Sequence, residues 1–91
     1  MRKRLRILIR GKVQGVSFRY YAKDAADALG LDGFVRNLAD GSVEIVAEGE
    51  EKELAKLLKW SYDGSKAAEV HQVEKEWLKP GSDLAGFSII M

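Results

Sequence analysis

Hydrophobic and polar residues alternate near the start of the chain. In the segment 4–10, Leu5, Ile7 and Ile9 share one face, whereas the arginines lie on the other. Such a period of two is typical of a β-strand with one buried face. Leu8 interrupts the polar face, so we expect this strand to lie inside a sheet and to be partly covered on both faces.

The spacing of apolar residues then changes to that of an amphipathic helix. In segment 17–30 the apolar positions are Phe18, Ala22, Ala25 and Leu29. Ser17 is the expected N-cap, and Gly30 is the expected end of the helix.

A second helix is predicted from about Glu50 to Asp63. Acidic residues open this segment, where the helix dipole favours them, and Gly64 follows its end. Its predicted apolar face consists of Leu54, Leu57, Leu58 and Ser61.

Three further strands complete the pattern. Two short β runs within 31–49 flank Asp40 and Gly41, and an Asp-Gly pair is typical of a hairpin. The segment 69–78 reads as a strand whose apolar phase changes between Val70 and Val73, which predicts a β-bulge there. The residues 86–90 predict a short last strand.

The predicted order is β-α-β-β-α-β with one additional β-strand. This order is that of the α+β class, as a ferredoxin-like split βαββαβ sandwich with a mainly antiparallel sheet. We expect two helices on one face of the sheet and a short extra C-terminal strand. The length of 91 residues favours a single domain, 1–91.

Composition narrows the possible functions. The chain has 15 Lys and Arg against 14 Asp and Glu, so its charge does not call for a nucleic acid or an anionic membrane. It has no cysteine, which excludes a thiolate nucleophile and cysteine metal sites, and a single histidine, His71, which excludes a zinc site built on histidine pairs. No apolar run reaches the length of a membrane helix. We therefore expect a soluble protein of the cytoplasm. We also expect a monomer that uses no metal and no cofactor.

The loop between the first strand and the first helix has the features of an anion site. Backbone N–H groups of such a loop converge beside the positive end of the helix dipole. Gly15 can adopt backbone angles that other residues avoid and leaves space for a ligand. Arg19, on the first helical turn, could grip two oxygens of the same anion. A solvated surface arginine after an ordinary glycine loop is the alternative.

Asn37 immediately precedes the predicted hairpin turn. Asparagine is a poor strand former, and it often caps turns, which is the simpler explanation of this residue. On these local grounds alone, a role of Asn37 in a site and a role in the turn both stay open.

Two longer motifs resemble the acylphosphatase family. The sequence GKVQGVSFR (11–19) is similar to the family signature G-x-V-Q-G-V-x-F-R, and GFVRNLADGSVE (33–44) is similar to its second signature. The order of elements agrees over essentially the whole chain. Two residues, Ser17 and Ala39, differ from the commoner forms of the family, and neither matches a catalytic position.

The resemblance implies an activity and a set of site residues. It implies metal-independent hydrolysis of acyl phosphates, with inorganic phosphate as product. The arginine matching Arg19 and the asparagine matching Asn37 would be catalytic, with Asn37 positioning the attacking water. The phosphate-binding residues implied are Gln14, Gly15, Val16, Ser17, Phe18 and Arg19.

Three alternatives remain at this point. RNA-binding modules with a ferredoxin-like fold stack bases on aromatic residues of the two central strands, and the corresponding segments here contain none. A non-catalytic acyl-phosphate-binding domain is a second alternative, because related modules occur joined to larger proteins such as hydrogenase maturation proteins. A phosphoserine on Ser17 is a third, although no base adjoins it in sequence.

Overall fold

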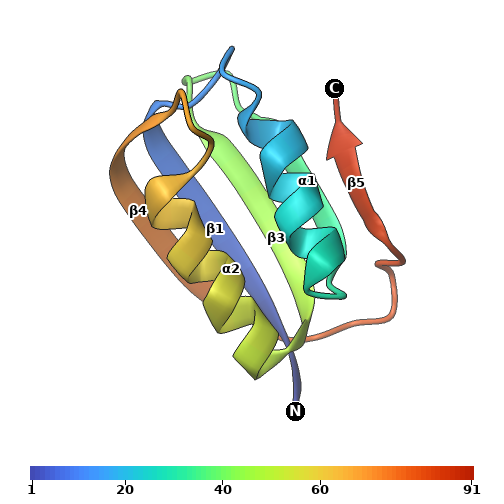
Figure 1. Ribbon diagram of the computed structural model, residues 1–91. Helices are drawn as coiled ribbons and strands as arrows, with labels where there is room; N and C mark the ends of the chain where they lie inside the picture. The colour runs from blue at the N-terminus through green and yellow to red at the C-terminus, as the bar shows by residue number, and fades with distance from the viewer.

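A computed structural model describes all 91 residues and shows the predicted order of elements (Figure 1). The bounds of the helices and strands are β1 Arg2–Lys12, α1 Phe18–Ala28, β2 Asp32–Asn37, β3 Val43–Glu50, α2 Glu51–Asp63, β4 Glu69–Leu78 and β5 Phe87–Ile90. The ferredoxin-like α+β prediction is therefore confirmed, including the extra C-terminal strand.

The five strands form one sheet in the order β4-β1-β3-β2-β5. The pairs are antiparallel except that β5 runs parallel to β2. Both helices lie on the same face of the sheet (Figure 1). The core lies between these two layers, and its largest fully buried side chain is Phe18, the first residue of α1. Burial of Phe18 therefore anchors the start of α1 next to the preceding loop.

The predicted bulge is present on β4. Arg10 faces Gln72 whereas Gly11 faces Val70, so His71 is an extra residue without a partner on β1. Gly11 has a φ of 136°, and a Cβ at this position would lie 2.1 Å from the Glu69 carbonyl oxygen. Only glycine fits at the bulge, since a side chain would collide with the backbone of β4.

The ends of the helices follow the prediction in position but not fully in mechanism. Gly30 has a φ of 68°, as expected for the residue that ends α1 in a left-handed turn. Ser17 is the N-cap of α1 by position, but it has a φ of 61° and its side chain makes no capping hydrogen bond. The predicted N-cap position is therefore confirmed, but the Ser17 hydroxyl does not stabilise the start of the helix.

The face of the sheet without helices is covered by ion pairs. Glu48 is fully buried and accepts hydrogen bonds from Arg4 Nε at 2.8 Å, Arg2 Nε at 3.1 Å and the Gly81 N–H at 3.0 Å. These contacts, the Gly81 N–H first, lower the pKa of Glu48 below its ordinary value. Leu8 is buried beneath this charged layer, which confirms that β1 is covered on both faces.

Candidate functional site

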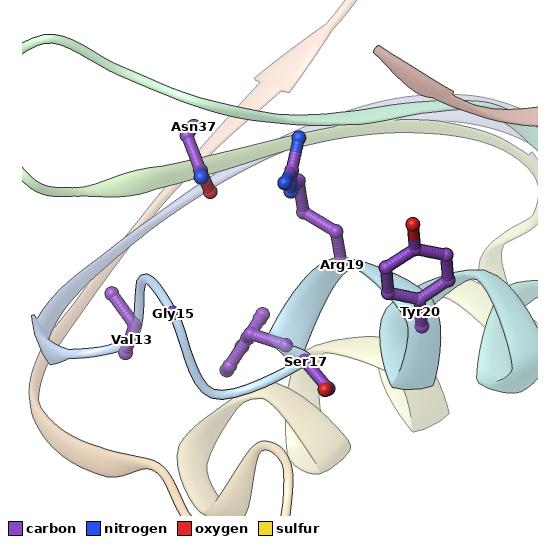
Figure 2. A pocket seen from close by; sticks show the side chains of 7 residues that line it. Val13, Gly15, Ser17, Arg19, Tyr20 and Asn37 are labelled. Atoms are coloured by element: carbon purple, nitrogen blue, oxygen red, sulfur yellow. The ribbon is translucent and has the colours of Figure 1, made fainter. Parts of the chain in front are cut away.

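A pocket of about 260 Å³ lies where the loop 13–17 meets the end of β2. Figure 2 shows the loop along one side of the pocket, with Asn37 and Arg19 facing it from β2 and from the first turn of α1. The residues that line the pocket are Val13, Gly15, Ser17, Phe18, Arg19, Tyr20 and Asn37. The fold thus brings together the loop, Arg19 and Asn37, which are separate in the sequence.

The loop beside this pocket has backbone N–H groups without partners in the protein. The N–H groups of Gln14, Gly15, Val16 and Ser17 donate no hydrogen bond within the protein. Two left-handed residues, Gly15 with a φ of 74° and Ser17 with a φ of 61°, turn the chain tightly before α1. Because the first N–H groups of a helix also lack partners, this segment concentrates donors and positive dipole ends that suit an anion.

Arg19 projects from the first turn of α1 toward the sheet, and its guanidinium points to the same space as the Asn37 amide (Figure 2). Its Nη1 donates to the Ile90 carbonyl oxygen at 3.1 Å and lies 3.6 Å from Met91 Sδ. Both acceptors are uncharged. The last residue of β5 and the following Met91 therefore orient Arg19 without neutralising it.

Arg19 differs in this respect from every other arginine of the chain. The remaining five each form an ion pair with at least one carboxylate; they are Arg2, Arg4, Arg6, Arg10 and Arg36. No carboxylate lies within ion-pair distance of Arg19. Its positive charge is available to a ligand in the pocket.

Asn37 is the last residue of β2, paired with Val43 at the end of the hairpin. The hairpin loop is held by Gln14, whose side-chain amide donates to the Leu38 carbonyl oxygen at 2.8 Å and to the Ser42 carbonyl oxygen at 2.9 Å. One side chain of the loop 13–17 thus fixes the hairpin loop that follows Asn37. The positions of Asn37 and of the free N–H groups are coupled through Gln14.

The hairpin loop is also stabilised from within. Asp40 Oδ1 accepts hydrogen bonds from the Ser42 hydroxyl at 2.5 Å and from the Ser42 N–H at 3.0 Å. These contacts, together with a weaker one from Arg10, lower the pKa of Asp40 to about 2. Asp40 is therefore ionised at neutral pH and keeps the turn in one conformation.

The predicted phosphate-binding residues lie at different places relative to the pocket. Gly15, Ser17, Phe18 and Arg19 line the pocket directly. Gln14 does not line the pocket, and its side chain points to the hairpin instead. The carbonyl of Val16 accepts from the Ser65 hydroxyl at 3.0 Å, and its side chain packs against the core. Val16 and Gln14 thus hold the loop in place.

Sequence reasoning missed several participants. Val13 forms part of the pocket wall, and Ile90 orients Arg19. The parallel pairing of β5 with β2 produces the second contact, and no local pattern reveals that pairing. Tyr20 borders the pocket, and it is about half exposed.

Other chemically suggestive residues lie outside the pocket. His71 is exposed on the bulge of β4, with its Nε2 3.4 Å from Glu69 Oε1. No hydrogen bond joins the Ser17 hydroxyl to a basic side chain. No group of three His, Asp or Glu side chains is arranged to hold a metal ion, and neither helix is long and apolar enough to cross a membrane.

Known proteins are similar to this chain in sequence and in fold. The family model described as acylphosphatase matches residues 5–89. An acylphosphatase of Anaeromyxobacter dehalogenans is 48% identical over 97% of this chain and 95% of its own length. An acylphosphatase of Roseiflexus is 46% identical over 96% of this chain and 94% of its own. The crystal structure of an acylphosphatase from Bacillus subtilis has a TM-score of 0.93 at 36% identity, with all of both chains covered.

Proposed function

The chain belongs to the acylphosphatase family, and on this premise we propose that it hydrolyses acyl phosphates to a carboxylate and inorganic phosphate. In the proposed site, Arg19 and the N–H groups of residues 14–18 bind the phosphoryl group, and Asn37 holds the attacking water. The proposal includes catalysis without a metal or an organic cofactor by a monomer in the cytoplasm.

The observation that carries this proposal is the uncompensated charge of Arg19. Five arginines are paired with carboxylates, whereas Arg19 is directed by two neutral acceptors into a pocket beside unused N–H donors. A dianionic phosphoryl group would accept hydrogen bonds from Arg19 and from these N–H donors at the same time. A guanidinium and preorganised N–H groups stabilise the equatorial oxygens of a phosphoryl group in the transition state.

The proposed reaction is a direct displacement at phosphorus. The oxygen of a water held by the Asn37 amide attacks the phosphorus atom, while the bond from phosphorus to the acyl oxygen breaks. The electron pair of that bond leaves with the carboxylate, which is a stable anion and needs no general acid. Because the Asn37 amide cannot accept a proton, we assign the proton of the water to a phosphoryl oxygen of the substrate.

The other two functional classes fit the molecule less well. The central strands β1 and β3 display ion-paired Arg6 and Glu44 on the open face, and they offer no aromatic side chain for stacking RNA bases. A non-catalytic acyl-phosphate-binding domain would need Arg19 and the loop. It would not need Asn37 beside them, and the presence of Asn37 in the pocket favours turnover.

The test is hydrolysis of benzoyl phosphate in excess EDTA by the wild-type protein and by Asn37→Ala. We expect the wild type to be active, and the variant to lose about 100- to 1000-fold in kcat, as for other single preorganised groups. Inorganic phosphate should still bind to Asn37→Ala, because Arg19 and the loop are unchanged. An inactive wild type that binds phosphate would support the binding domain instead, and EDTA-sensitive activity would contradict metal independence.

A further inference from the structure

We infer that a second pocket, on the other side of the loop 13–17, binds the acyl part of the substrate and favours acyl groups that carry a second negative charge. This inference rests on the proposed function and extends it to the substrate class. The second pocket has a volume of about 430 Å³, and its lining residues are Gly15, Val16, Ser17, Tyr21, Lys66 and Ala67.

The two pockets adjoin each other at Gly15 and Ser17. Gly15 and Ser17 line both of them, so the edge between the pockets consists of a residue without a side chain and a small one. A Cβ at Gly15 would meet no atom within 4 Å, which means that the space over this residue is open. In Figure 2 the Ser17 side chain points away from Arg19 and Asn37. A ligand in the first pocket can therefore extend into the second.

The geometry of in-line displacement gives the direction of that extension. The leaving oxygen lies opposite the attacking water across the phosphorus atom. Asn37, the proposed water holder, lines only the first pocket, whereas Tyr21 and Lys66 line only the second. The acyl group, as the leaving group, consequently points away from Asn37 and toward Tyr21 and Lys66.

The far wall of the second pocket is fixed to the loop. The Ser65 side chain is buried, and its hydroxyl donates to the Val16 carbonyl oxygen at 3.0 Å. The Ser65 carbonyl oxygen accepts from the Ala68 N–H at 2.9 Å, which closes the turn that contains Lys66. Lys66 therefore stands at a defined place relative to the phosphate-binding loop.

The chemistry of the wall indicates the ligand. The Tyr21 side chain is 50% exposed and, with Val16 and Ala67, offers apolar surface for a carbon skeleton. Lys66 is the only charged residue that lines the second pocket, and it forms no ion pair within the protein. An acyl phosphate with a carboxylate or phosphate at its far end would place that charge near the Lys66 ammonium group while its phosphoryl group stays at Arg19.

A pair of substrates that differ in one group tests the inference. Benzoyl phosphate and 4-carboxybenzoyl phosphate share the reacting centre, and only the second carries a far carboxylate. We expect the wild type to have the higher kcat/KM for the carboxylated substrate. In Lys66→Ala this preference should fall about 5-fold at low salt, which corresponds to one charge pair in a solvated setting. Lys75→Ala, on β4 and outside both pockets, is the matched control.

The outcomes separate the two proposals. Hydrolysis of both substrates, with a preference that Lys66→Ala leaves within 2-fold of wild type, would overturn the acyl pocket and leave the proposed function intact. Hydrolysis of neither substrate would overturn the proposed function. In that case the binding of 4-carboxybenzylphosphonate and benzylphosphonate decides the second pocket alone, and an equal affinity of Lys66→Ala and wild type for each would reject it. For the carboxylated substrate, Lys66→Ala should raise KM and leave kcat unchanged, and high salt should abolish this difference from wild type. Such a result supports a binding role for Lys66.

Discussion

Arg19 and Arg4 are the same kind of side chain in two opposite settings. On the open face of the sheet, Arg4 donates to the buried Glu48 at 2.8 Å and to Asp83, so its charge is fully used inside the molecule. On the helix face, at the end of β2, Arg19 meets only the Ile90 carbonyl oxygen and Met91 Sδ. The charge of Arg4 is paired with carboxylates of the protein, and the charge of Arg19 is not.

The same contrast extends to the backbone around each arginine. The Gly81 N–H beside Arg4 donates to Glu48 at 3.0 Å, whereas the N–H groups of residues 14–17 beside Arg19 have no acceptor in the protein. Several N–H groups that point out of one loop beside a helix start suit an anion better than a backbone already paired within the protein. The difference teaches that a site is better identified by missing partners than by residue type.

The largest expected effect is on Arg19. Arg19→Ala should lower kcat/KM for benzoyl phosphate about 100- to 1000-fold, because it removes one preorganised charge from the transition state. Its free energy of unfolding should change little, since the substitution leaves no carboxylate without an ion-pair partner. Steady-state kinetics and urea denaturation of the same preparation measure both quantities. If Arg19→Ala kept wild-type activity, the catalytic role that distinguishes Arg19 from Arg4 would be contradicted.

The next effect concerns the tie between the loop and the hairpin. Gln14→Ala removes two hydrogen bonds, to Leu38 and Ser42, and should let Asn37 shift relative to the loop. Small displacements of catalytic groups cost up to about 100-fold, so we expect kcat to fall about 10- to 100-fold. Gln72→Ala on β4 is the matched control and should retain full activity. Loss of phosphate affinity without loss of kcat would show that Gln14 acts on binding alone.

Arg4 should show the reverse of Arg19. Arg4→Ala leaves one oxygen of the buried Glu48 with fewer donors, which should reduce the free energy of unfolding by about 1–3 kcal/mol. Its kcat/KM should stay within about 2-fold of wild type, because the change lies on the opposite face of the sheet from the helices. Urea denaturation followed by circular dichroism gives the first value. A catalytic loss comparable to that of Arg19→Ala would contradict the separation.

The smallest effect is a pH dependence of stability from Asp40. Its pKa in the folded protein is about 2, below the ordinary value of 3.8, so the ionised Asp40 stabilises the fold above about pH 4. That contribution is lost as the pH falls from about 4 to about 2. Asp40→Asn keeps an acceptor for Ser42 but does not titrate, so its unfolding free energy should decline less steeply over this range. Urea denaturation at several pH values tests this, and identical slopes would contradict it.

The sequence predicted the fold well because local patterns carried it. The period of two in β1, the helical spacing in α1 and α2, and the phase change at Val70 each depend on neighbouring residues, and the structure confirms all of them. Ser17 is the N-cap that the sequence predicts, but its backbone is left-handed and its side chain makes no capping hydrogen bond. The exception occurs where the loop turns toward the pocket.

The site was only partly predictable for a physical reason. Gly15, Arg19 and Asn37 were found from the loop and from the resemblance to a family. That Arg19 is unpaired depends on where five other arginines find carboxylates, often more than 30 residues away. The anchoring of Gln14 to residues 24 and 28 positions further along is equally invisible in local sequence. Partners, and their absence, are properties of the folded chain.

The most direct test of the central claim is a titration of ¹⁵N-labelled protein with inorganic phosphate, followed by two-dimensional NMR. The account predicts saturable shifts of the amide signals of residues 14–18 and of the Arg19 side chain, with the open face around Glu48 unaffected. In Arg19→Ala the same amides should shift only at much higher phosphate concentration. Shifts centred on another arginine, or no shifts in the loop, would contradict the claim that Arg19 and the loop bind an anion.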